Sequence, residues 1–112
     1  MAFVDHDPGE VEACGNAARC VATLLGANAR IDSAAGILDA AATDAAATIL
    51  YPPPRFGWDE IPLAYAMDTQ DMPVGWDELE RPIAVNVGNP HVIFFVPDVD
   101  AVPLDVLGPV IE

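Results

Sequence analysis

The run Glu12-Ala13-Cys14-Gly15-Asn16-Ala17-Ala18-Arg19-Cys20 places a cysteine where an amphipathic helix is expected to begin. Free backbone N–H groups and the positive end of the helix dipole meet at a helix N-terminus. A thiol in such a place is partly thiolate near neutral pH, and the same N–H groups can hold a carboxylate. The segment therefore combines a base with an anion-binding site, which suits proton abstraction beside a carboxylate.

The second cysteine, Cys20, lies six residues after Cys14, which is about 240° around a helix. The two thiols then point apart and do not form a disulfide within that helix. Their spacing also lacks the ligand pattern of a zinc site, so we expect no bound metal. We expect Cys20 to pack in the core, and Arg19 to form a helix salt bridge or to cap nearby carbonyl groups.

Composition narrows the class of protein. The chain has 112 residues, of which 53% are hydrophobic, enough for a small domain with a modest core. Eighteen acidic residues face four arginines, and the formal net charge of −14 opposes binding to nucleic acid or to anionic membranes. No apolar run reaches the roughly 20 residues that span a bilayer, and the first residues do not resemble a signal peptide. We predict a cytoplasmic protein.

Periodicity and turn residues predict an α/β (α+β) fold. The first half is expected to hold a strand at residues 2–4, an acidic turn with Pro8-Gly9, and a helix over 14–26 that ends at Gly26. Because nearly all faces of that helix are small or apolar, we expect it to be buried on most sides. Three short strands should follow, although their alanine runs also favour helix, at residues 29–34, 36–41 and 47–51.

The second half begins with an extended run of three prolines at residues 52–54 and a connector over 56–81. Residues 83–87 and 92–96 are predicted as strands, joined by Gly88-Asn89-Pro90-His91, and a turn and short helix are expected within residues 99–112. The change in composition near residue 58 predicts a junction between two halves, each too small to fold well alone.

Three motifs in order make the sequence resemble the diaminopimelate epimerase family. The run at residues 12–20 resembles its first active-site motif, residues 53–58 its segment between domains, and Gly88-Asn89-Pro90-His91 its second-domain substrate motif. The resemblance covers essentially the whole chain, but the chain covers only the middle of the family's length. It implies two domains, each a barrel-like sheet around a central helix, with residues 1–58 in the N-terminal domain and 59–112 beginning the second.

The resemblance also implies a chemistry. The family inverts one stereocentre of diaminopimelate for lysine and peptidoglycan synthesis, without pyridoxal phosphate or a metal, by means of two cysteines on opposite faces of the α-carbon. Cys14 matches the first catalytic cysteine and His91 a histidine near the catalytic centre. Gly15 and Asn16 match the N–H donors that hold the α-carboxylate, and Asn89 matches a substrate-binding asparagine. A full-length enzyme of this kind would be expected as a homodimer.

Two departures from the family's sequence affect the predicted substrate binding and activity. Asp5 falls where the family usually has a substrate-binding asparagine, and an ionised aspartate repels a carboxylate. The family's opening segment would lie before Met1, and its second catalytic cysteine would lie beyond Glu112. Because a two-base mechanism needs an acid opposite the base, we expect the chain alone to be inactive as an epimerase. We also expect marginal stability, since incomplete sheets expose their edges.

Two other functions stay open. A proline or hydroxyproline racemase of the same fold usually has histidine after Cys-Gly, where this chain has Asn16. A non-catalytic remnant that binds amino-acid carboxylates would keep the helix mouth without turnover. Cys14 taken alone would be an inert buried thiol, Asn89 a turn former, and Asn86 a strand or turn residue. The tryptophans are expected to be packing anchors, namely Trp58 and Trp76.

Overall fold

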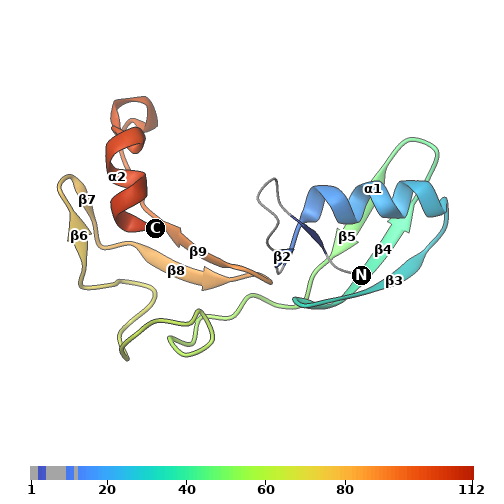
Figure 1. Ribbon diagram of the computed structural model, residues 1–112, viewed down its shortest axis with the longest axis horizontal. Coiled ribbons are helices and arrows are strands. Elements are labelled where there is room, and N and C mark those ends of the chain that lie inside the picture. Colours follow the sequence, from blue (N-terminus) through green and yellow to red (C-terminus); the bar gives the residue numbers. More distant parts are fainter. Residues whose placement is uncertain (1–2, 5–9, 12) are drawn as a thin grey trace. The chain divides into compact units, whose positions relative to one another are not determined.

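The computed structural model describes residues 3–4, 10–11 and 13–112. These residues form a mixed α/β structure of two α-helices, one 3-10 helix and four small sheets, and none of the described sheets closes into a barrel (Figure 1). The chain divides into two compact units. The first consists of Met1–Arg55 with Asn86–Pro90, and the second of Phe56–Val85 with His91–Glu112.

The helix of the first unit, α1 (Gly15–Leu25), begins and ends as the sequence predicts. Cys14 is its N-cap residue, and the thiol makes no capping hydrogen bond. At the other end Gly26 adopts the left-handed conformation, with φ 61°, and its N–H donates to the carbonyl groups of Ala22 and Thr23. Glycine adopts this conformation without a steric penalty, so it ends the helix.

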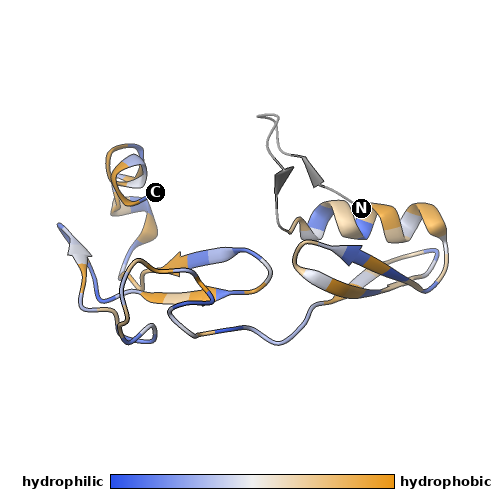
Figure 2. Ribbon diagram, turned by 60° about the horizontal axis from the view of Figure 1, so that its bottom comes forward, coloured by the Kyte–Doolittle hydropathy of each residue, from blue (hydrophilic) through white to orange (hydrophobic). Residues whose placement is uncertain are grey.

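The three predicted strands form one antiparallel sheet in chain order, confirming the choice of strand over helix for the alanine-rich segments. The strands are β3 (Ala29–Ser33), β4 (Gly36–Ala42) and β5 (Ala47–Leu50). The helix α1 lies along one face of this sheet (Figures 1 and 2). Side chains alternate across a strand, so one set from the sheet meets one stripe of the helix. The resulting core consists of Ala18, Ala22, Ile31, Leu38 and Ala40.

The prediction that α1 is buried on most sides is wrong. Only Ala18 and Ala22 are buried, whereas Leu24 is 87% exposed, although the C-terminal half of the helix consists mostly of hydrophobic residues (Figure 2). Cys20 is exposed as well, so its predicted place in the core is also wrong. The reason is that a single three-stranded sheet covers only one face of a helix.

Two short strands precede α1. They are β1 (Phe3–Val4) and β2 (Glu10–Val11), which pair antiparallel with Phe3 opposite Val11. The strand predicted at residues 2–4 is confirmed for its last two residues. The predicted turn with Pro8-Gly9 lies outside the described residues, as does Asp5.

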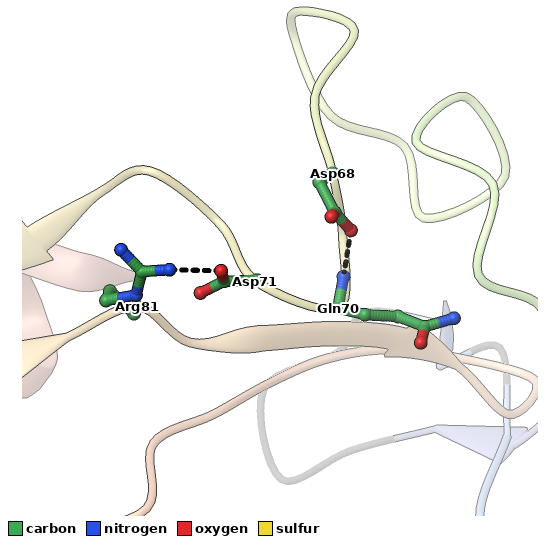
Figure 3. A network of polar contacts seen from close by, with 4 residues as sticks. All are labelled: Asp68, Gln70, Asp71 and Arg81. Atoms are coloured by element: carbon green, nitrogen blue, oxygen red, sulfur yellow. Dashed lines mark hydrogen bonds and ion pairs between the residues drawn. The ribbon is translucent and has the colours of Figure 1, made fainter.

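In the second unit, the predicted connector is more than a linker. It contains the hairpin of β6 (Gly75–Trp76) and β7 (Leu79–Glu80), and the buried side chains of Ile61, Met72 and Ala84 form a small core. Polar contacts hold the segment before the hairpin, as Figure 3 shows: the Asp68 carboxylate accepts a hydrogen bond from the Gln70 N–H at 2.9 Å, and Arg81 pairs with Asp71.

Two strands follow at the predicted place, but the second begins earlier than the hydrophobic run predicts. They are β8 (Ile83–Asn86) and β9 (Pro90–Ile93), which pair with each other. The turn between them is closed by a hydrogen bond from the Val87 N–H to the Asn89 carbonyl at 3.2 Å, and β9 begins directly after it. Beyond it, Phe94 instead packs edge-on against Trp76, with ring centroids 6.0 Å apart. This contact confirms that Trp76 is a packing anchor.

The chain ends with the 3-10 helix η1 (Val99–Ala101) and the helix α2 (Leu104–Ile111), which confirms the short helix predicted there. Leu107 is the buried residue of α2. None of the helices in the described part of the chain is long and apolar enough to cross a bilayer.

The packing of α1 on its sheet gives a test of the fold. Leu38 is completely buried, so Leu38→Ala should lower the free energy of unfolding by about 2–5 kcal/mol, because it removes apolar contacts and leaves a cavity. Leu50→Ala is the matched control, since Leu50 lies on the neighbouring strand with 67% of its surface exposed and should change stability by no more than about 0.5 kcal/mol. Urea unfolding measures both, and equal losses would contradict the described core.

Candidate active site

The predicted base lies at the mouth of α1. Cys14 is half-buried and packs against the core of the first unit, as does Tyr51, the residue that follows β5. A Cβ atom placed on Gly15 would lie only 3.2 Å from the hydroxyl oxygen of Tyr51. The phenol therefore lies over the first turn of the helix, beside the residue that follows the cysteine.

Burial and two nearby charges act on Tyr51. Burial raises the pKa of the Tyr51 phenol, the Cys14 thiolate raises it further through charge repulsion, and Arg19 lowers it. At neutral pH the phenol is consequently a neutral hydrogen-bond donor. Sequence reasoning missed this residue, and the only signal for it was an aromatic side chain at the end of a predicted strand, directly before the prolines.

The turn that carries the second predicted motif lies against the first motif. Gly88 has φ 116°, and a Cβ atom on it would lie 2.7 Å from the Cβ of Ala35 and 3.2 Å from the Cβ of Ala13. It would also lie 3.8 Å from the Cδ1 atom of Tyr51. Only glycine fits both the conformation and the space. The residue before Asn89 thus touches the residue before Cys14, within one compact unit.

The predicted site residues are only partly brought together. Gly15 and Asn16 lie exposed in the first turn of α1, in the same unit as Cys14 and Asn89. Asn89 is half-buried, and its carbonyl oxygen accepts a hydrogen bond from Val87 at 3.2 Å.

The other two predicted residues do not belong to the described part of this helix mouth. His91 is exposed on β9 and belongs to the second unit. Asp5 has no described position, so the interpretation of its departure from the family stays a prediction.

Among the described residues, the contact of Arg19 differs from the expected salt bridge or carbonyl cap. Its guanidinium donates a hydrogen bond to the side-chain oxygen of Asn16. The two residues line an open hollow of about 740 Å³ between α1 and the turn at residues 43–47, together with Cys20. In the described part of the chain, His, Cys, Asp and Glu nowhere gather in threes or more in a way that could hold a metal ion.

Comparison with known proteins identifies the source of these motifs. Over all 112 residues the chain is 60% identical to diaminopimelate epimerase of Rhizorhabdus wittichii, 60% identical to that of Sphingopyxis alaskensis and 58% identical to that of Zymomonas mobilis. The chain is homologous to part of diaminopimelate epimerase. It spans about 41–42% of the length of these curated relatives. No family model matches the chain.

The burial and charges around Tyr51 predict how its phenol titrates. Its midpoint should lie above the ordinary tyrosine value of about 10. Cys14→Ala should lower the midpoint because it removes a negative charge, and Arg19→Gln should raise it further because it removes a positive one. Difference absorbance between each protein and its Tyr51→Phe form isolates this phenol, over the pH range in which circular dichroism shows an unchanged fold.

Cys20→Ala is the control for this titration. Cys20 lies on the same helix but about 240° around its axis from Cys14, so its removal should leave the midpoint of Tyr51 in place. A shift of equal size for both cysteine variants would contradict the placement of Tyr51 beside Cys14.

Proposed function

We propose that this chain supplies the first of the two acid/base cysteines of a diaminopimelate epimerase. The observation that carries the proposal is the position of Cys14 at the N-cap of α1, beside the Gly88 turn, with a side chain that makes no capping hydrogen bond. The chain is also 57–60% identical to enzymes of that name. Because the chain spans less than half of those relatives, the activity of the whole protein is inferred rather than observed.

In the proposed reaction the Cys14 thiolate removes the α-proton of diaminopimelate. The C–H bond breaks, the proton moves to sulfur, and the electron pair stays on the α-carbon and its carboxylate. The N–H groups of the first turn, at Gly15 and Asn16, donate to that carboxylate and stabilise the developing charge. A second thiol on the opposite face then returns a proton, which inverts the stereocentre.

Asn89 is proposed to bind the substrate from the Gly88 turn, and His91 to help position the reacting groups. The contact of Gly88 with Ala13 supports the role of Asn89, since it places the turn beside the helix mouth. The remaining parts of the family's fold, a barrel-like sheet in each of two domains, are likewise proposed for the whole protein. A small amino acid as the partner agrees with a net charge of −14, and we propose a cytoplasmic location.

A segment exchange tests the function. The 112 residues replace the segment that they match in the Rhizorhabdus wittichii enzyme, and inversion of diaminopimelate is measured with α-hydrogen exchange in deuterated water. We expect turnover, and a loss of about 10²–10⁴-fold in kcat for Cys14→Ala, since a positioned base contributes this much. Cys20→Ala, on the exposed side of the same helix, should keep the activity.

Each alternative function gives a different result in this experiment. A racemase acting on proline would exchange the α-hydrogen of proline in preference to that of diaminopimelate. A remnant that only binds carboxylates would exchange neither. Equal activity of the Cys14→Ala and Cys20→Ala proteins would show that Cys14 is not the base.

A further inference from the structure

The turn at residues 86–90 is held by hydrogen bonds that the proposed chemistry does not use. The backbone of Asn86 pairs antiparallel with that of Arg55: the Arg55 N–H donates to the Asn86 carbonyl at 2.8 Å, and the Asn86 N–H donates back at 2.9 Å. The side-chain oxygen of Asn86 accepts from the Arg55 guanidinium at 3.0 Å and from the Gly88 N–H at 2.8 Å. One amide oxygen therefore joins the turn to the segment after the prolines.

The chemistry of these groups makes the arrangement specific. An amide oxygen has two lone pairs, and here both accept a hydrogen bond. The bond to Gly88 closes a turn across two residues, a conformation that asparagine and aspartate favour, and it accompanies the positive φ of Gly88. Asn86 is buried, with 6% of its surface exposed. Loss of its side-chain oxygen would leave the buried Gly88 without this acceptor, which is costly.

The consequence of the arrangement is a tight placement of Gly88. Its backbone fits against Ala13, Ala35 and Tyr51 with no room for a methyl group. A displacement of the turn would therefore either collide with these residues or separate Asn89 from the mouth of α1. Substrate-binding groups lose much of their effect when they move by about 1 Å.

We propose that Asn86 and Arg55 are positioning residues that hold the Gly88-Asn89 turn for substrate binding. The proposal rests on the proposed function, because Asn89 is taken as the substrate-binding side chain. Neither residue touches a reacting atom. Their effect should appear in how well the substrate binds, and not in the pH dependence of the proton transfer.

The chimeric enzyme, in which the 112 residues replace the matching segment of the Rhizorhabdus wittichii enzyme, tests this role. Asn86→Leu, which has no acceptor, and Arg55→Met, which loses only the guanidinium, should each raise KM by about tenfold to a hundredfold with a smaller change in kcat. Asn86→Asp should stay close to the unsubstituted protein, because a carboxylate accepts both hydrogen bonds and pairs with the guanidinium. The pH profile of kcat should be the same in all four proteins.

Arg30→Met is the matched control. It also removes one arginine, and the guanidinium that it removes pairs with Asp39 at 2.8 Å on an exposed strand surface. We expect an unchanged KM for this variant. A purely structural role for Asn86 and Arg55 would lower the fraction of active enzyme and leave KM unchanged, and that result in both variants would overturn the proposal.

The 112-residue chain itself gives a second readout that does not depend on activity. Exchange of the Gly88 N–H with deuterated water, followed by NMR, should be faster in Asn86→Leu than in the unsubstituted chain, and the Asp variant should restore protection. If the Gly88 N–H exchanged at the same rate in a folded Asn86→Leu chain and in the unsubstituted chain, the hydrogen bond from Gly88 to Asn86 would not hold the turn. Failure of the proposed function can be told apart from failure of this positioning role. If the proposed function is wrong, the chimeric enzyme has no turnover or keeps the same turnover in its Cys14→Ala form.

Discussion

The contact between α1 and its sheet fixes the position of everything else in the first unit. Ala18 and Ala22 are completely buried, and their small side chains let the helix lie close to Ile31, Leu38 and Ala40. Protein interiors are packed as densely as crystals, so this contact leaves little freedom for the helix to shift. Because β5 lies under α1, the residue after the strand, Tyr51, meets the first turn of the helix. The site is thus a consequence of alanine packing several residues away.

Much of this arrangement could be predicted from the sequence. The glycine at position 26 stops the helix, and the short segments bounded by glycine or aspartate predict strands where β3, β4 and β5 form. What could not be predicted was the exposure of the outer side of α1 and of Cys20 on it. Apolar residues show that a face of a helix can be buried. Whether that face is buried depends on how many neighbouring strands or helices pack against it.

The same limit applies to the site. The residue types at Cys14 and Asn89 indicated chemistry, but the contacts that join their segments run over long separations in the chain. Gly88 approaches Ala13 and Ala35, and Asn86 bonds to Arg55, in each case through backbone conformations that no local pattern specifies. Tyr51 was missed for this reason, since a tyrosine at the end of a strand has no special signal until the helix is placed above it.

A cysteine at the N-cap fits the ligand-binding role proposed for this helix mouth. Serine, threonine, aspartate and asparagine accept hydrogen bonds from the first-turn N–H groups and stabilise a helix by about 1 kcal/mol. Cys14 makes no such bond, so α1 gives up that stabilisation. The C-terminal cap at Gly26 and the packing of Ala18 and Ala22 hold the helix instead. A helix held in this way can direct first-turn donors toward a substrate carboxylate, because its stability does not depend on a side chain that would occupy them.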